Sequence, residues 1–189
     1  ITNASSGKMG YAIARACLRR GAKVTLITGP SQISINHFEA FTPLTVIPVE
    51  SAADMCETTI DIFKSADISI LCAAVADFTP KYTATQKIKK QHGQTSMTIE
   101  MTMTTDIAAT LGKCKRGDQK IIGFALETHD EMQNAQKKLH SKNLDMIVLN
   151  SLQDAGAGFG TDTNKVSLLF SNGATKNLPL MSKEEVADK

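Results

Sequence analysis

The sequence predicts an α/β protein with a doubly wound, mostly parallel, Rossmann-like sheet and a C-terminal β-hairpin. Short β-branched or apolar segments alternate with longer amphipathic ones along most of the chain, as in successive βαβ units. The segment 67–75 (DISILCAAV) is almost entirely apolar, as expected of a central parallel strand that is buried on both faces. Two strand-like segments, 166–170 and 175–178, flank Asn172-Gly173, a dipeptide that favours a tight hairpin turn.

The first half of the chain is expected to supply two strands and two helices before that central strand. Apolar residues at helical spacing, ended by a glycine, predict a helix over 11–20, and the β-branched segment 23–28 predicts a strand. A further strand is expected over 44–49, and Pro48, which cannot donate to a neighbour, indicates an edge of the sheet or the end of the strand. A serine cap and apolar spacing predict the second helix over 51–65.

The second half is expected to add three strands and two helices before the hairpin. Alternating apolar residues predict a strand over 98–103, and short apolar runs predict strands over 121–125 and 146–150. Helical spacing predicts helices over 106–113 and 129–142. Strands that alternate with helices in this way give right-handed parallel crossovers.

We expect one domain over residues 1–189, truncated at its N-terminus, since no linker or repeat divides the chain and Ile1 is not a methionine. Hydrophobic residues make up 42% and charged residues 21%, as in an ordinary globular protein. The formal net charge of +2 is too small to favour nucleic acid or an anionic membrane as a partner. No apolar run approaches the ~20 residues that span a bilayer, so a cytoplasmic protein is expected.

The cysteines and histidines give no sign of a metal site. Cys17, Cys56, Cys72 and Cys114 are widely spaced beside apolar segments, and we expect them to be buried, reduced thiols. The four histidines form no cluster of the kind that binds zinc. These residues single out no metal ligand.

Ligands of a doubly wound sheet bind outside the carboxyl ends of its strands. Four segments of this chain are expected there: the turn 3–10, the stretch 73–77, the strand end at Gly123-Phe124 and the loop after Asn150. They predict one crevice that could hold a ligand.

The turn 3–10 lies between an expected first strand, of which only Ile1-Thr2 is present, and the first helix. Gly7 and Gly10 allow a ligand to approach the backbone, and the free N–H groups of a helix N-terminus can bind an anion. The turn is not a Walker A loop, because Met9 follows Lys8 where Ser or Thr is needed, and it is not G-x-G-x-x-G. Glycines and an asparagine at such a turn can also serve packing and turn geometry alone.

The long polar segment 78–96 is the main candidate for phosphate binding. A compact domain rarely keeps such a loop without a use for it, and its lysines could close over phosphates and stabilise charge that builds up during transfer. A solvated basic loop would have the same composition. The lysines of this segment are Lys81, Lys87, Lys89 and Lys90.

Three further residues are candidates by position. Asp77, at the end of the apolar strand, could accept hydrogen bonds from a ligand, help to hold a metal or cap a loop. Lys138 and Lys142 are four residues apart on one helix face, which by itself indicates only a solvated surface.

Several segments of the chain occur in the same order in one enzyme family. They are I-T-N-A-S-S-G-K-M-G at 1–10, A-A-V-A-D-F at 73–78, K-I-K-K at 87–90, G-F-A-L-E-T at 123–128 and A-Q-K-K-L-H-S-K at 135–142. With D-M-I-V-L-N, F-G-T-D-T-N-K-V and L-P-L-M-S-K after them, these segments closely resemble the bacterial type of phosphopantothenoylcysteine synthetase. The resemblance covers nearly the whole chain and is therefore more specific than any single glycine motif.

The resemblance implies a two-step ligation in coenzyme A biosynthesis. The carboxylate of 4′-phosphopantothenate attacks the α-phosphate of CTP, with Mg²⁺, and gives an acyl-CMP intermediate and pyrophosphate. The amine of cysteine then displaces the nucleotide and forms an amide. The family is dimeric, so a homodimer is expected, and a flavin-dependent decarboxylase domain can precede the ligase domain.

The resemblance also implies a role for individual residues. Asn3 and Lys87 would be catalytic, Asn3 by binding phosphopantothenate and the acyl intermediate, and Lys87 by stabilising charge. Asn3, Gly7 and Ala74 would bind the acyl substrate. The nucleotide would be bound by Ala73, Asp77, Lys87, Asp106, Ile107, Phe124, Lys138 and Lys142. Where the family commonly has Asn-Pro-Asp-Ile, this chain has Thr104-Thr105 before Asp106 and Ile107, which leaves any contact of that asparagine side chain open.

Two other functions compete with the ligase. The turn also resembles the cofactor turn of short-chain dehydrogenases that use NAD(P), but such an enzyme needs Tyr-x-x-x-Lys, and Tyr82 has Gln86 at that spacing. A non-catalytic nucleotide-binding module would show the same crevice without turnover.

Overall fold

The computed structural model describes residues 5–31, 33, 43–89, 93–127, 129–151 and 161–189. Its main sheet has five strands in the order β10-β9-β7-β6-β3. The parallel part consists of β3 (Ile68–Leu71), β6 (Lys120–Glu127) and β7 (Met146–Ser151). The antiparallel strands β9 (Val166–Phe170) and β10 (Thr175–Asn177) extend it, so the mixed, mostly parallel sheet and its terminal hairpin are confirmed.

A second parallel pair continues the α/β pattern. In it, β1 (Val24–Thr28) pairs with β2 (Leu44–Pro48). Within the described residues β2 pairs with β1 alone, which agrees with the edge position that Pro48 predicts. The strand expected at Ile1-Thr2 lies outside the described residues.

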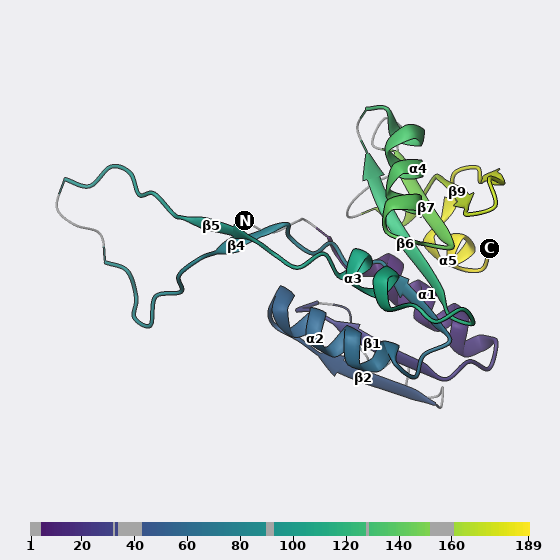
Figure 1. The fold of residues 1–189 in the computed structure, drawn as a ribbon, viewed down its shortest axis with the longest axis horizontal. Helices are drawn as coiled ribbons and strands as arrows, with labels where there is room; N and C mark the ends of the chain where they lie inside the picture. The colour runs from purple at the N-terminus through teal and green to yellow at the C-terminus, as the bar shows by residue number, and fades with distance from the viewer. Residues whose placement is uncertain (1–4, 32, 34–42, 90–92, 128, 152–160) are drawn as a thin grey trace.

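Helices cover both faces of the five-stranded sheet (Figure 1). One face packs against α2 (Ala52–Phe63), α3 (Ile107–Cys114) and α4 (Glu131–Ser141) through a cluster that includes Phe63 and Leu111. The opposite face packs against α1 (Lys8–Arg19) and α5 (Lys183–Ala187), with Met9 against Val148 and Val166 in its cluster. This two-sided cover is the doubly wound arrangement that the alternating elements predict.

Capping side chains explain where several helices begin. Ser51 accepts a hydrogen bond from the Asp54 N–H while the Asp54 side chain accepts one from the Ser51 N–H, a reciprocal capping box. Ser182 and Glu185 form the same arrangement at α5. The N-terminus of α1 lacks a side-chain cap of this kind, and Gly7 turns the chain into the helix with φ of 79°.

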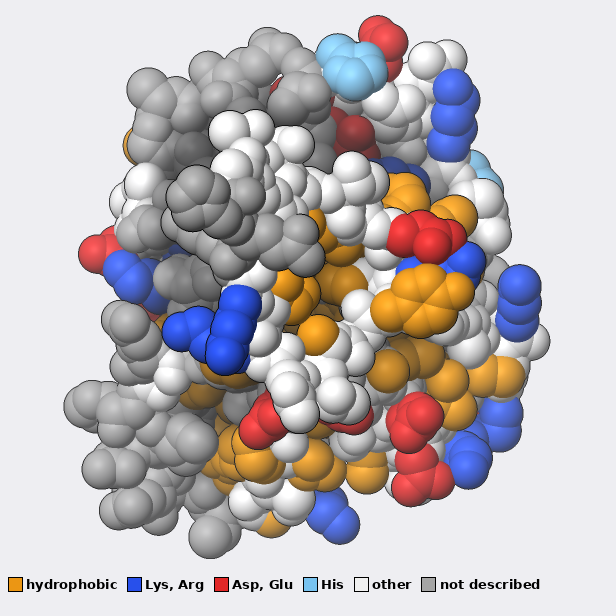
Figure 2. Space-filling view, turned by 90° about the vertical axis from the view of Figure 1, so that its left-hand side faces the viewer, with side chains coloured by type: hydrophobic (Ala, Val, Ile, Leu, Met, Phe, Trp, Pro, Cys, Tyr) orange, Lys and Arg blue, Asp and Glu red, His pale blue; other side chains and the backbone are white. Residues whose placement is uncertain are grey.

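A long arm leaves the body between β3 and α3. It comprises residues 78–103, and at its base β4 (Phe78–Pro80) pairs antiparallel with β5 (Met101–Met103). Figure 1 shows the arm extending away from both helical layers. Its exposed apolar side chains are Phe78, Tyr82, Ile88, Met97, Ile99 and Met103. Figure 2, which views the molecule from the side of the arm, shows apolar side chains at the surface of this face.

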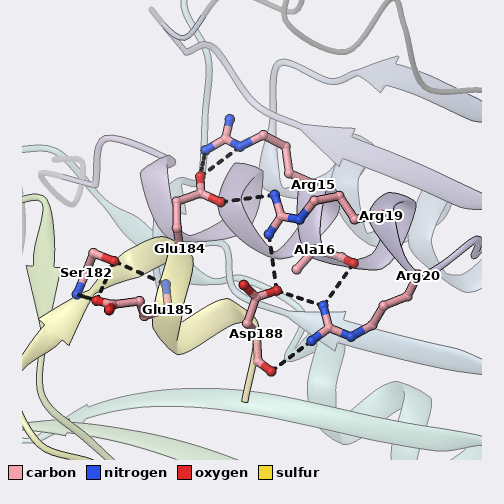
Figure 3. Close-up of polar contacts among 8 residues, drawn as sticks. All are labelled: Arg15, Ala16, Arg19, Arg20, Ser182, Glu184, Glu185 and Asp188. Carbon is pink, nitrogen blue, oxygen red and sulfur yellow. Dashed lines mark hydrogen bonds and ion pairs between the residues drawn. The ribbon is translucent and has the colours of Figure 1, made fainter.

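The C-terminal helix α5 is fastened to α1 by ion pairs (Figure 3). Arg15 Nε donates to Glu184 Oε1 at 2.8 Å, and Arg20 donates to Asp188 Oδ1 at 2.7 Å. Arg19 bridges the two acidic residues, at 3.5 Å from Glu184 and 3.1 Å from Asp188. The cluster joins the two ends of the described chain, which lie more than a hundred residues apart in sequence.

Several predicted boundaries were wrong. Helix α1 begins at Lys8 rather than residue 11, because the left-handed Gly7 directly precedes it. Strand β3 ends at Leu71 rather than residue 75, and Ile68 is 58% exposed, so the strand is not buried on both faces. The expected strand 98–103 pairs only over Met101–Met103. Two short strands, β8 (Thr163–Asn164) and β11 (Met181–Ser182), and helix α5 were not predicted.

The cysteines are free, as expected, but they are not all buried. Cys56 is buried, whereas Cys114 at the end of α3 is exposed. Burial raises the pKa of Cys72 to about 12, so this thiol stays protonated at neutral pH. Among the described residues, no helix is both long and apolar enough to cross a lipid bilayer.

Candidate active site

The carboxyl end of β3 carries the first group of candidate residues. The chain leaves the sheet after Leu71, and Ala73, Ala74 and Asp77 are all exposed. The small side chains of Ala73 and Ala74 leave the backbone here accessible to a ligand. Asp77 is the last residue before the arm begins.

Thr104 fixes the two ends of the arm to each other. Its hydroxyl donates to the carbonyl oxygen of Ala76 at 2.6 Å, and its N–H donates to the carbonyl oxygen of Asp77 at 2.9 Å. Thr104 stands where the resemblance implies an asparagine, and the threonine hydroxyl serves to close the base of the arm.

Asp106 and Lys142 form an ion pair between the N-terminus of α3 and the C-terminal cap of α4. Asp106 caps α3 by accepting a hydrogen bond from the Ala109 N–H at 2.9 Å, and Lys142 Nζ lies 2.9 Å from its other oxygen. Partial burial raises the pKa of Asp106, but the hydrogen bonds from Lys142 and from the Ala109 N–H outweigh it, so the pKa is lowered overall. Asp106 is therefore ionised at neutral pH and holds Lys142 at the N-terminus of α3.

The second pair joins Lys138 to Glu127. Lys138 Nζ lies 2.6 Å from Glu127 Oε1, at the carboxyl end of β6. The Glu127 side chain is only 12% exposed while that of Lys138 is 44% exposed. Helical side chains lean toward the helix N-terminus, so both lysines of α4 reach back toward the carboxyl edge of the sheet. Both lysines are thus held by carboxylates from other elements rather than free on a solvated face.

Phe124 and Ile107 contact the hydrophobic core. Phe124 is half-buried on β6 and packs against the cluster that contains Met9 and Val148. Ile107 is buried in the opposite cluster. A ligand contact at Ile107 would therefore use its backbone, which begins α3.

The N-terminus of α1 lies on the other side of the sheet from the lysine pair. Lys8 Nζ is 2.6 Å from Asp162 Oδ1, and Lys183 Nζ donates to the carbonyl oxygen of Thr161. Burial and the nearby charge of Lys8 lower the pKa of Lys183. Gly7 stands at this corner, while Asn3 lies outside the described residues.

The structure does not bring Lys87 to the other candidates. The expected fold of the lysine segment over the crevice is wrong for this conformation, because Lys87 and Lys89 are exposed on an arm that points away from the body (Figure 1). Lys81 pairs with Glu100 across the arm at 2.5 Å, and Lys90 lies outside the described residues. The base of the arm, by contrast, is joined through Thr104 to the segment that follows β3.

Sequence reasoning missed two carboxylates that pair with lysines, Glu127 with Lys138 and Asp162 with Lys8. Glu127 lies within the motif at 123–128, and a carboxylate at the end of a buried strand is a signal that could have found it. Asp162 directly precedes the short strand β8 and Lys183 begins helix α5, and neither element was predicted, so no periodicity pointed to these residues. The described residues hold no group of three or more His, Cys, Asp or Glu side chains that could bind a metal ion.

Comparison with known proteins supplies the family. The whole chain, residues 1–189, matches the family model described as the DNA/pantothenate metabolism flavoprotein C-terminal domain. The coenzyme A biosynthesis bifunctional protein CoaBC of Bacillus subtilis is 48% identical over 99% of this chain and 44% of its own length. A prokaryotic protein named cysteine/cysteine sulfinic acid decarboxylase is 49% identical over 99% of this chain and 50% of its own length.

A solved structure is also similar to this chain. The crystal structure of the C-terminal domain of a coenzyme A biosynthesis bifunctional protein CoaBC has a TM-score of 0.77 and 40% identity, and the match covers 97% of this chain and 78% of that chain. The chain spans about half the length of the curated relatives it matches. This chain belongs to the family of DNA/pantothenate metabolism flavoprotein C-terminal domains.

Proposed function

We propose that this domain ligates 4′-phosphopantothenate to cysteine in coenzyme A biosynthesis, through an acyl-nucleotidyl intermediate. The observation that carries the proposal is the match to the C-terminal domain of CoaBC over 97% of this chain. The crevice supports it, since carboxyl strand ends, a helix N-terminus and anchored lysines suit a reaction between a triphosphate and a carboxylate.

The proposed reaction has two balanced steps. A carboxylate oxygen of phosphopantothenate attacks the α-phosphorus of CTP, and the bond to the β-phosphate oxygen breaks to release pyrophosphate. The cysteine amine then attacks the acyl carbon and expels CMP, while the amine proton passes to solvent. Negative charge grows on the phosphates in the first step, so cations placed there stabilise the transition state more than the ground state.

The proposed residue roles are those that the family resemblance implies. Lys138 and Lys142 would contact the nucleotide, beside Asp106 and the backbone of Ile107. Ala73 and Phe124 would border the nucleotide on the sheet. Lys87 would stabilise the growing charge, whereas Asn3, Gly7 and Ala74 would bind the acyl substrate.

Mg²⁺ would bind with the triphosphate rather than in a protein cage. Mg²⁺ commonly uses one or two carboxylates together with phosphate oxygens and waters. Asp77 fits such a single ligand, because its side chain is exposed beside the open backbone of Ala73 and Ala74. The ion would neutralise phosphate charge during the first step.

We further propose that the protein acts as a homodimer whose arms reach a second copy. The arm leaves its own body and exposes Tyr82 to 72% and Met103 to 75%, which is more apolar surface than a solvated loop needs. A second copy would cover these side chains and receive Lys87 at its crevice. Mixing Lys87→Gln with Asp77→Asn subunits tests this: recovered turnover supports action across the dimer, and none contradicts it.

The proposed setting is a cytoplasmic enzyme with no nucleic acid or membrane partner. A flavin-dependent decarboxylase domain is proposed as a fused partner upstream, because the bifunctional relatives are about twice as long as the matched segment. The relative named as a decarboxylase fits the same arrangement, since half of its length lies outside the match.

Product analysis tests the proposed function against its alternatives. Incubation with phosphopantothenate, CTP, Mg²⁺ and isotopically labelled cysteine is expected to give the labelled amide by mass spectrometry. Comparing kcat/KM for CTP and ATP tests the choice of nucleotide. Binding of NADPH without ligation would favour the dehydrogenase, and CTP binding without product would favour a non-catalytic module.

A further inference from the structure

Glu127 is a carboxylate at the carboxyl edge of the main sheet that is largely shielded from solvent. It is the last residue of β6, and its backbone is in parallel register with Ser151 of β7. Its side chain is only 12% exposed. Carboxylates are seldom buried to this degree unless they are paired, because an ionised group without a partner loses its hydration without compensation. The environment of Glu127 therefore depends on its partner.

The side chain of Glu127 lies on the face of the sheet that α4 covers. Along β6, Ile121 and Ala125 pack in the cluster beneath α2, α3 and α4, whereas Ile122 and Phe124 pack in the α1 cluster. Side chains alternate along a strand, so Glu127 follows Ala125 on the α4 side and lies two residues nearer the carboxyl edge. Glu127 thus stands between the core and the edge at which ligands of this fold bind.

Lys138 is the partner of Glu127, and the packing of α4 fixes the Lys138 backbone. Ala135 and Leu139 of α4 are buried in the same cluster as Ala125. From this helix Lys138 reaches the sheet, where its Nζ lies 2.6 Å from Glu127 Oε1. Since both backbones are held by the core, the carboxylate selects one conformation of a long side chain that otherwise has many rotamers.

The ammonium group of Lys138 keeps donors for a ligand while it is held. It has three N–H donors, and within the part of the chain that the structure describes its one partner is the Glu127 carboxylate. The Lys138 side chain is 44% exposed, in contrast to the carboxylate that holds it. The remaining donors can therefore reach a ligand that has no access to Glu127 itself.

We propose that Glu127 is a positioning residue for the nucleotide, which acts by holding the Lys138 ammonium group where it donates to phosphate oxygens. The proposal rests on the proposed ligase function, in which Lys138 contacts the nucleotide, and it adds a residue that acts only through that lysine. A triphosphate that binds here meets a cation already ordered by the protein, so less side-chain entropy is lost on binding.

Neutralising Glu127 has two opposite effects on nucleotide binding, and the sign of the result separates them. Glu127→Gln removes a negative charge near the triphosphate, which by itself strengthens the binding of CTP. The same change releases Lys138 into other rotamers, which weakens binding. Because positioning is the proposed role, CTP is expected to bind about tenfold more weakly to Glu127→Gln, equal to about 1.4 kcal/mol.

Calorimetry with Mg²⁺ and either CTP, CMP or cytidine, without phosphopantothenate, measures this effect. The loss of affinity should be largest for CTP, smaller for CMP and absent for cytidine, because the lysine is directed at phosphate oxygens. In a Lys138→Gln background, Glu127→Gln should not weaken CTP binding further, since the two residues act as a unit. Glu57→Gln changes an exposed glutamate of α2. It is the matched control and should bind CTP as the wild type does.

A second variant and thermal melts separate positioning from a structural role. Glu127→Asp keeps the charge on a side chain one methylene shorter, so it should weaken CTP binding by a smaller factor, and it serves if the glutamine variant does not fold. Variants that melt earlier and lose affinity for cytidine as much as for CTP would show that Glu127 only tethers α4, which overturns the proposal. Unchanged or tighter CTP binding by folded variants would also overturn it.

The proposed ligase function fails in a different way. Wild-type protein that binds CTP but forms no amide product would contradict the ligase function, while the difference between CTP and cytidine would still decide the role of Glu127. Wild-type protein that does not bind CTP would overturn both.

Discussion

At the scale of single residues, the proposed nucleotide lysines differ in how they are held. Lys138 and Lys142 are each paired with a carboxylate from another element, at 2.6 Å and 2.9 Å. Lys87 is exposed and forms no ion pair within the described residues. The paired lysines are preorganised for binding, whereas Lys87 is free to engage charge that appears only during the reaction.

Replacing Lys87 with Gln is expected to lower kcat by roughly 10²–10³-fold, the range for loss of one electrostatic donor. The melting temperature should not change, because an exposed side chain on the arm contributes little to the core. Lys89→Gln, on the same arm and equally exposed, is the matched control and should keep near-normal turnover. Steady-state kinetics with saturating CTP measures both, and equal kcat for the two variants would remove Lys87 from the mechanism.

Asp145 directly precedes β7, and its carboxylate interacts with several groups inside the protein. It lies 2.6 Å from Lys115 and accepts the Ile121 N–H at 2.8 Å, and Lys120 is 3.2 Å away. Burial raises the pKa of Asp145, but these hydrogen bonds lower it further, so the folded pKa lies below the usual value. A depressed carboxyl pKa stabilises the folded state above the unfolded pKa of about 3.9, and that stability is lost as the pH falls through the folded pKa.

Asp145→Asn is therefore expected to lower the free energy of unfolding by about 1.5–3 kcal/mol at pH 7, the range for hydrogen bonds to charged groups. The difference from wild type should begin to shrink below about pH 4, where the unfolded carboxylate takes up its proton, and should be lost once the pH is below the depressed folded pKa. Urea unfolding at pH 7 and pH 3 measures it, with the exposed Asp67→Asn as control. A difference that is constant with pH would contradict the account.

At the scale of elements, the position of Lys142 depends on close contact between α3 and the end of α4. A Cβ placed on Gly112 would lie 1.9 Å from the carbonyl oxygen of Lys142. Asn143 also donates to the Gly112 carbonyl at 2.9 Å. Backbone atoms cannot yield as a flexible side chain can, so only glycine allows this approach.

Gly112→Ala is expected to destabilise the protein by at least about 1–3 kcal/mol, the usual cost of overpacking. It should also raise the KM for CTP, because moving α4 shifts Lys142 away from Asp106. Gly117→Ala meets no atom within 4 Å and should fall within about 0.5 kcal/mol of wild type. Thermal melts and nucleotide kinetics on both variants check this, and a Gly112→Ala protein as stable as Gly117→Ala would refute the close contact.

At the scale of the whole molecule, the ion pairs between α1 and α5 join the C-terminal helix to the first helix (Figure 3). The Glu184 and Asp188 side chains are 43% and 42% exposed, so each ion pair is open to solvent screening. Each of these ion pairs therefore contributes little to the free energy of unfolding, and its contribution depends on ionic strength.

Glu184→Gln is expected to cost roughly 0.2–1 kcal/mol of unfolding free energy at low salt. At 1 M NaCl, where the Debye length is about 3 Å, the difference should nearly vanish. Glu57→Gln on α2 is the control, since Glu57 is exposed and forms no ion pair in the described part of the chain. A cost that persists at high salt would assign Glu184 a packing role instead.

The alternation of strands and helices was sufficient to predict the sheet, the helical layers and the hairpin, because each depends on local periodicity. The short strands β8 and β11 pair over two residues each, too few for any period to show. The crevice was predicted from strand ends and stays a prediction, as does the nucleotide contact of Asp106, which caps α3 in the structure. The direction of the arm and the partners of Lys138 and Lys142 depend on tertiary contacts, which sequence spacing does not encode.

The most direct measurement of the central claim is pyrophosphate release from CTP with cysteine omitted. The account predicts release only when phosphopantothenate is present, at most stoichiometric with enzyme if acyl-CMP stays bound, and sustained once cysteine is added. Pyrophosphate released at the same rate without phosphopantothenate, or none released with all substrates present, would contradict the acyl-nucleotidyl mechanism.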